Sequence, residues 1–448
     1  MEKSIWQTLL SVALILALLM SITASSALAQ SATAYEDTEI VMWTFLDPYS
    51  GTSGREAALA KMIASFEAET GITCKVECME YGILASMFLT AGASGNAPDL
   101  IWVSVSDIGN VITQGRLAPL EECFMDEWTQ EEWADADTPA FRAGVDEEGL
   151  HYQLPFSTNY IGLIYRTDLL AEAGYDFSDG SGFASWEDFY EAVGKLTVET
   201  DSVTGTKRYG YGSAFPTTSA DTILLSNLYL DKNGAIWNED GTAAWANEAG
   251  LMGVEMISNM LVNAYMSDTC LSDTVNNLYE DFKAGKYAMI NGPSSRLANL
   301  IAGAAFDPST IRLMPYPSDD GGFSPSVLSG WCVGIWNESP RKRAAGAFLE
   351  HMFYNDELWV IEGGQPPMLR STEAKLAEAN FFEDPANLFV KDIVHCITNA
   401  SVSQPTAYSI SGWRNDLTGV LQNVLVNGAE PMTALEDAEF EFNDRNGR

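Results

Sequence analysis

The first third of the chain alternates between two hydrophobic periods. Apolar runs at 39–45, 72–80 and 99–104 predict buried strands. Between them, apolar residues recur at three- and four-residue spacing over 55–69, and a second helix is predicted over 81–91. This β-α-β-α-β order favours a parallel, doubly wound α/β lobe, because each helix returns the chain to the same edge of the sheet.

Strands and helices are also predicted in the rest of the chain, up to the C-terminus. Strands are expected at 150–155 and 160–165, and a helix is expected to begin at a capping box over 185–188. Another helix is predicted to start with Ser339 as N-cap, and a last amphipathic helix at about Thr433. Because 448 residues exceed what one core usually holds, we expect two mixed α/β lobes with a ligand between them.

The first 29 residues resemble an export signal. Lys3 provides a basic start, an apolar run covers 9–22, and the small-x-small pattern at 27–29 predicts cleavage after Ala29. The alternative is an uncleaved anchor, although the run is shorter than the roughly 20 residues of a spanning helix. No Cys lies near the cleavage site, so the lipid-attachment pattern of lipoproteins is missing. We therefore expect a free periplasmic or secreted protein.

The charge of the chain excludes one class of partner. There are 62 Asp and Glu against 24 Lys and Arg, which gives a net charge of -38. A nucleic acid needs a surface rich in Lys and Arg, and an anionic membrane surface would be repelled by the same field. The overall charge does not exclude a small basic pocket.

Residues for metal binding or catalysis are sparse. The three His stand far apart, and the sequence contains no C-x-x-C, G-x-S-x-G or Walker motif. We therefore predict no metal, no cofactor and no catalytic residue. The six Cys are expected to be buried free thiols or to form one or two disulfides, and they are Cys74, Cys78, Cys123, Cys270, Cys332 and Cys396.

Aromatic residues make up 11% of the chain, and several stand where a predicted strand ends. Trp43, Tyr81 and Trp331 occupy such positions. In a doubly wound lobe the carboxyl ends of the strands form the ligand crevice, and flat rings suit the apolar faces of sugars. The alternative for each ring is packing in the core.

Several ordered motifs carry a family likeness. They are G-N-A-P-D at 95–99, Q-G-R-L-A-P-L at 114–120, L-I-Y-R-T-D-L at 163–169, S-W-E-D-F at 185–189 and F-K-A-G-K-Y-A-M-I-N-G-P at 282–293. With these motifs the chain resembles extracellular solute-binding protein family 1 of ABC sugar import systems, the group that includes maltose-binding protein. The resemblance extends in order over essentially all of the chain after the signal.

The resemblance implies a periplasmic binding protein-like fold of type II. Two doubly wound α/β lobes would be joined by a hinge of three crossings. After a signal peptide at 1–29, the N-terminal lobe would comprise 36–144 and 327–384, and the C-terminal lobe 145–326 and 385–448. The crossings are expected near Val145, Val327 and Pro385. The lobes would close on the solute, and an ABC permease would recognise the closed monomer, without catalysis.

The resemblance also implies ligand contacts at particular positions. Ser294 stands where many sugar-binding relatives carry Trp, and Asp107 is expected to accept hydrogen bonds from sugar hydroxyls or to cap a helix. Trp413 matches a late aromatic residue of the relatives. With Tyr81 from the strand ends, the predicted ligand-binding residues are Trp43, Phe45, Tyr81, Ser104, Asp107, Asn159, Tyr160, Ser294, Trp331, Trp413 and Arg414.

The predicted function is capture of a carbohydrate, most simply an oligosaccharide, for import. Within the same class, the alternative is another polar solute such as a polyol, a sugar phosphate or a peptide. From a different class, the alternative is a secreted glycosidase. Release of reducing ends from an oligosaccharide would distinguish the enzyme from a protein that only binds.

Overall fold

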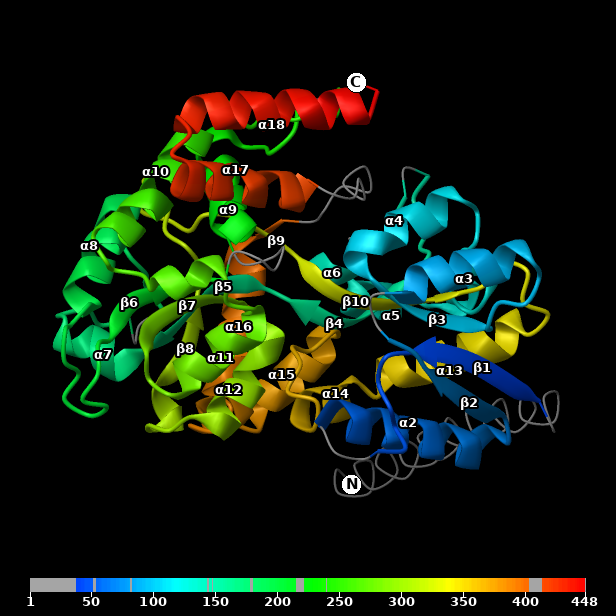
Figure 1. Ribbon diagram of the computed structural model, residues 1–448. Helices are drawn as coiled ribbons and strands as arrows, with labels where there is room; N and C mark the ends of the chain where they lie inside the picture. The colour runs from blue at the N-terminus through cyan, green and yellow to red at the C-terminus, as the bar shows by residue number, and fades with distance from the viewer. Residues whose placement is uncertain are drawn as a thin grey trace, which may run out of the picture.

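The computed structural model contains two lobes, each built around its own sheet (Figure 1). The residues that it describes are 38–50, 54–80, 83–142, 145–146, 148–177, 180–214, 221–238, 240–402 and 413–447. The predicted export signal and Tyr81 lie outside this set. Two α/β lobes confirm the predicted fold class. No helix within the described ranges combines the length and apolar character needed to cross a bilayer.

The first lobe is centred on a five-stranded sheet with the order β2-β1-β3-β10-β4. Its strands are β1 (Glu39–Thr44), β2 (Thr73–Cys78), β3 (Leu100–Ser104), β4 (Leu154–Asn159) and β10 (Ser329–Ile335). β1 runs parallel to β2 and β3, whereas β10 is antiparallel to both β3 and β4. The first three strand predictions are confirmed, and the strand predicted at 150–155 begins later, at Leu154.

Helices cover both faces of this sheet. The helices of the lobe are α2 (Gly54–Thr70), α3 (Leu84–Ala93), α4 (Val105–Thr113), α5 (Gln130–Ala136), α6 (Pro139–Arg142), α13 (Lys342–Tyr354), α14 (Asp356–Ile361) and α15 (Arg370–Glu378). α2 and α13 share a core on one face, where the ring centroids of Phe66 and Phe348 are 5.0 Å apart. Phe88 of α3 and Val111 of α4 are fully buried in a second core on the other face.

The helix predicted to start at Ser339 starts later. α13 begins at Lys342 with Arg341 as its N-cap residue. The Ser339 hydroxyl instead donates to Oδ1 of Asp99 at 2.6 Å. Asp99 is 1% exposed and also accepts the backbone N–H of Val41 and the Arg341 guanidinium. A buried carboxylate needs several hydrogen-bond donors. The Ser339 hydroxyl is one of these donors to Asp99 and is not the N-cap of α13.

The second lobe has a four-stranded mixed sheet with the order β6-β7-β5-β8. The strands of the lobe are β5 (Ile161–Arg166), β6 (Tyr209–Gly212), β7 (Tyr287–Pro293), β8 (Ile311–Met314), and a separate pair β9 (Ser326–Val327) and β11 (Ser401–Val402). β5 is antiparallel to β7 and β8, whereas β6 and β7 are parallel.

Helices also enclose the second sheet on two sides. They are α7 (Thr167–Glu172), α8 (Trp186–Leu196), α9 (Asp221–Asn233), α10 (Glu248–Val262), α11 (Val275–Lys283), α12 (Leu297–Gly303), α16 (Leu388–Ala400), α17 (Trp413–Asn427) and α18 (Pro431–Arg445). Leu163 and Tyr165 of β5 pack towards α8, α10 and α17, whereas Ile164 packs towards α11, α12 and α16. This alternation follows from the two-residue period of a strand.

The predicted start of α8 is confirmed in part. The Ser185 hydroxyl accepts the backbone N–H of Asp188 at 3.1 Å, as an N-cap should. The Asp188 carboxylate binds the backbone N–H of Ala184 instead of that of Ser185, so the reciprocal half of the capping box is shifted by one residue.

The first connection between the sheets lies at Tyr160, between β4 and β5. The boundary expected near Val145 is therefore too early: Val145 pairs with His151 ahead of β4, and β4 belongs to the first sheet. The second connection leads from β9 into β10. After α15 the chain enters α16, which is joined to β8 by the ion pair of Arg312 and Asp392.

All six Cys are free thiols in the structure, so no disulfide links the elements. Five are buried, and Cys78 at the end of β2 is exposed. We expect one thiol per chain to react rapidly with a small aromatic disulfide reagent under native conditions, and all six in denaturant. Cys78→Ser should abolish the rapid reaction. More than one rapidly reacting thiol in the native protein would contradict this burial pattern.

Candidate functional site

Polar and aromatic residues meet at one edge of the first sheet. β1, β3 and β4 end at this edge, and β10 begins there. Trp331 of β10 lies opposite Ser104 of β3 and Ser157 of β4, and Ser329 lies opposite Asn159. Ligands of open α/β sheets bind outside the carboxyl ends of the strands, so this edge is the candidate site.

The second sheet joins the first at the same place (Figure 1). Ile161, the first residue of β5, pairs with Pro293 at the end of β7. The backbone N–H of Ser294 donates to the carbonyl of Tyr160 at 2.8 Å, and the Ser294 hydroxyl accepts the Tyr160 N–H at 3.2 Å. Ser294 is thereby held beside the connection that follows Asn159, at the border between the two lobes.

Two half-buried rings form the aromatic part of the site. The ring centroids of Phe45 and Trp331 are 4.1 Å apart, with an interplanar angle of 44°. Trp102 packs edge-on behind Phe45 at 6.4 Å and is itself 5.9 Å from Trp359 of α14. The buried rings behind the pair hold it in place and leave part of Phe45 and Trp331 accessible. Phe45, Ser104, Asn159, Ser294 and Trp331 are thus brought to one border between the lobes.

Buried polar groups accompany the rings. The Ser157 hydroxyl donates to Oε1 of Gln365 at 2.9 Å, and both residues are buried. Asn159 is 7% exposed, and its Oδ1 has no hydrogen-bond partner among the described residues. A buried amide oxygen without a donor is costly in a folded protein, and a ligand hydroxyl would supply that donor.

Ser157 and Gln365 were missed by the sequence analysis. Residues of a strand alternate between its faces, so a strand over Leu154–Asn159 would have placed Ser157 and Asn159 on the same side. The predicted strand ended at Pro155 and concealed this pattern. Gln365 lies in a loop between Gly and Pro residues, and no local pattern distinguishes it.

A third residue that sequence reasoning missed contributes charge. Arg55, in the first turn of α2, places its guanidinium carbon 5.7 Å from the centroid of Phe45. Burial lowers the pKa of Arg55 from its usual value, and repulsion by Arg296 of the second lobe lowers it further. Glu56 has the opposite, smaller effect. The site therefore has one cation, Arg55, beside Phe45, and Arg296 of the second lobe lies near enough to repel that cation.

Other predicted residues have different surroundings. The indole N–H of Trp43 donates to Oε2 of Glu77 at 2.9 Å, and the ring packs on the α3 and α4 side of the sheet. Asp107 is exposed in the first turn of α4. Arg414 belongs to α17, but its side chain lies outside the described set.

Tyr160 and Trp413 are core residues. Tyr160 is 0% exposed, and burial raises the pKa of its hydroxyl well above the usual value. Trp413 is 8% exposed and lies 5.9 Å from Trp237, centroid to centroid, inside the second lobe. Both rings therefore pack in the cores of the second lobe, Tyr160 with α11, α12 and α16, and Trp413 with α10 and α18.

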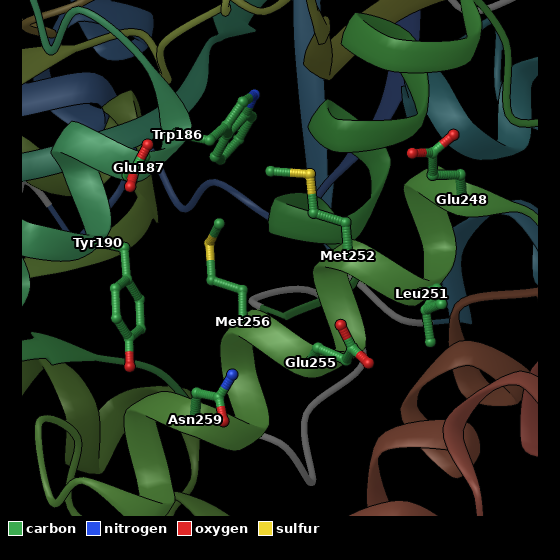
Figure 2. Close-up of a pocket in the computed structure, with 9 residues that line it drawn as sticks. All are labelled: Trp186, Glu187, Tyr190, Glu248, Leu251, Met252, Glu255, Met256 and Asn259. Atoms are coloured by element: carbon green, nitrogen blue, oxygen red, sulfur yellow. The ribbon is translucent and has the colours of Figure 1, made fainter.

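A separate pocket of about 440 Å³ lies between α8 and α10. Figure 2 shows Tyr190, Met252 and Met256 projecting into the space between the helices, with Glu187 and Glu255 at its sides. These helices lie on the side of the second lobe that is remote from the first (Figure 1). None of the predicted ligand-binding residues lines this pocket. Among the described residues, no group of three His, Cys, Asp or Glu is placed to hold a metal ion.

Solved structures share this fold. The GacH receptor of Streptomyces glaucescens, solved unliganded and with acarbose, has 20% identity and a TM-score of 0.71 over 91% of this chain and 98% of its own. The substrate-binding protein Lmo0181 of Listeria monocytogenes, solved with cycloalternan, has 18% identity and a TM-score of 0.72 over 92% and 100%. UgpB of Mycobacterium tuberculosis, solved with glycerophosphocholine, has 18% identity and a TM-score of 0.71 over 92% and 100%.

At these identities the structural likeness establishes the fold alone. Among curated proteins, none matches the chain in sequence. A family model described as "Bacterial extracellular solute-binding protein" matches residues 50–357, which include β2, β3, β4, β10 and most of the second lobe. That match covers more than half of the chain. This protein therefore belongs to the bacterial extracellular solute-binding proteins.

Proposed function

We propose that the protein captures a carbohydrate between its two lobes and delivers it to an ABC permease. The observation that carries the proposal is the pair of half-buried rings, Phe45 and Trp331, together with Oδ1 of Asn159, which no described residue hydrogen-bonds. An aromatic platform with nearby polar groups suits the apolar face and hydroxyl rim of a sugar. The acarbose and cycloalternan complexes of two structural neighbours support a saccharide.

The proposed function also requires export of the protein and closure of its two lobes. Residues 1–29 act as a cleavable signal, and without a nearby Cys the mature protein is a free periplasmic or secreted monomer. Its lobes meet through the connections after β4, before β10 and before α16, and they close on the solute. The solute is released unchanged, since the site residues named here include no nucleophile paired with a base.

Calorimetric titration against neutral and acidic mono- and oligosaccharides tests the proposal. We expect stoichiometric binding, a change in Trp fluorescence and no release of reducing ends. Failure of every sugar to change either the heat signal or the melting temperature would refute carbohydrate capture. Product formation would instead support a glycosidase.

Trp331→Ala should weaken binding of the best sugar about 100-fold, because truncating a central aromatic contact costs roughly 2–4 kcal/mol. Trp331→Phe keeps a ring against Phe45 and should lose less than half of that free energy. Calorimetry gives the affinities, and circular dichroism checks that each variant remains folded. If both variants bind like the wild type, the ring pair is not the sugar platform.

A further inference from the structure

Arg55 and Arg296 differ from the other arginines of the protein. Eleven arginine side chains are described, and nine of them form ion pairs with Asp or Glu: Arg116, Arg142, Arg166, Arg208, Arg312, Arg341, Arg343, Arg370 and Arg445. Arg55 and Arg296 have no such pair with any described carboxylate. In a chain with 62 acidic and 24 basic residues, two cations without a carboxylate are available for an external anion.

The two arginines come from opposite lobes and lie near enough for Arg296 to act electrostatically on Arg55. Arg55 lies at the start of α2 in the first lobe, and Arg296 ends the short turn Ser294–Arg296 that follows β7 in the second. The loop after α14 lies between them. A Cβ at Gly363 would be 3.6 Å from Cγ of Arg55, and a Cβ at Gly364 would be 3.8 Å from Cβ of Ala298.

Both guanidinium groups lie against aromatic rings, and the Arg296 side chain also forms a hydrogen bond with the Tyr279 side chain. A guanidinium has five N–H donors, so this bond does not use all of them. Arg55 lies 5.7 Å from the Phe45 centroid, and Arg296 lies 5.5 Å from the Tyr279 centroid. Phe45 is also the partner of Trp331 in the proposed sugar platform. An anion between the two arginines would thus be adjacent to a sugar ring stacked on that platform.

We propose that the solute is an acidic sugar whose carboxylate or phosphate binds between Arg55 and Arg296. This inference rests on the proposed capture of a carbohydrate and specifies its class. Guanidinium groups bind the paired oxygens of carboxylates and phosphates through two parallel hydrogen bonds. The two cations repel each other as the lobes approach, so an anion between them favours closure. A neutral sugar lacks this contribution.

Two matched ligand pairs test the inference by calorimetry. Digalacturonic acid is compared with its dimethyl ester, and glucose 6-phosphate with glucose, which separates carboxylate from phosphate. We expect at least one acidic member to bind about 10- to 100-fold more tightly than its neutral partner, and the difference to shrink at high salt.

Arg296→Gln should remove most of that preference, because it weakens binding of the acidic ligand far more than binding of its neutral partner. Arg296 is exposed, and a glutamine side chain can still donate a hydrogen bond to the Tyr279 side chain, so the substitution should not affect folding. Lys342→Gln is the matched control, because Lys342 of α13 also lacks a described ion pair and lies outside the site. It should bind both ligands like the wild type.

The outcomes separate the two proposals. If neutral sugars bind at least as well as acidic ones, or if Arg296→Gln leaves the preference intact, the acidic class is wrong and carbohydrate capture stands. If no sugar of either kind binds, carbohydrate capture fails, and the acidic class fails with it.

Discussion

Asp99→Ala is expected to lower the free energy of unfolding by about 3–5 kcal/mol, because it removes the shared acceptor of several donors and each buried donor left unsatisfied costs about 1–3 kcal/mol. The Asp99 carboxylate is 1% exposed. It accepts the Val41 N–H at 2.9 Å, the Ser339 hydroxyl at 2.6 Å and the Arg341 guanidinium at 3.0 Å. Alanine would leave these donors without their acceptor and would detach β1 from the segment before α13.

Arg341→Gln is the matched control for this prediction. The Arg341 side chain is 42% exposed, so its loss leaves Asp99 with two donors and should cost about 1 kcal/mol or less. Urea unfolding followed by Trp fluorescence gives both values, and circular dichroism at 222 nm checks whether the lobes unfold together. A cost below about 1 kcal/mol for Asp99→Ala would contradict a structural role for this carboxylate.

Asp356→Asn is expected to stabilise the protein at pH 8 by about 4 kcal/mol and to give almost no gain near pH 4. Asp356 at the start of α14 is 0% exposed, and burial raises its pKa to about 7. Between the unfolded value near 3.8 and this value, the folded state binds more protons than the unfolded state. Stability from this group is therefore present at low pH and is lost as the pH rises towards 7.

Asparagine at position 356 retains an oxygen that can accept the same backbone hydrogen bonds as the Asp356 carboxylate. One carboxylate oxygen of Asp356 accepts the backbone N–H groups of Met368 and Leu369 at 2.7 and 2.9 Å. The amide oxygen can accept both, and the substitution replaces the buried charged carboxylate by a neutral amide. The measured quantity is the difference in unfolding free energy between variant and wild type from pH 4 to 8, since the titration of the other acidic residues cancels in it.

Asp307→Asn provides a control with the opposite sign. Asp307 is exposed, and the Ser309 hydroxyl and N–H lower its pKa. Its contribution to stability is present at neutral pH and is lost as the pH falls, so this variant should become slightly less stable than the wild type with rising pH. A difference for Asp356→Asn that is constant from pH 4 to 8 would show that this carboxyl does not titrate upon burial.

The local hydrophobic pattern was enough to predict the first strands and helices of the chain. The apolar runs and helical spacing placed β1, α2, β2 and β3 nearly as the structure has them, because each is long and strongly periodic. Predictions that depended on one side chain were less successful. Ser339 caps no helix and binds Asp99 instead, and this partner precedes it by more than half of the chain.

Among the site residues, too, some could be predicted from local sequence, whereas others depended on tertiary packing. Phe45, Ser104 and Trp331 were placed at strand ends by pattern and resemblance, and the structure brings them together. Tyr160 shares its local features with such residues, yet it is 0% exposed. Only the packing of α11, α12 and α16 around it decides between a ligand contact and a core position.

The sequence by itself determined an α/β protein with strands that end in aromatic and polar residues, and ordered motifs that indicated a solute-binding family. These properties follow from periodicity and local residue order. The tertiary structure decided that Arg55 and Arg296 interact electrostatically from opposite lobes, that Ser157 binds Gln365, and that Trp413 is buried in the core of the second lobe. Such contacts join residues far apart in the chain, and no local pattern encodes which surfaces the folded backbone brings together.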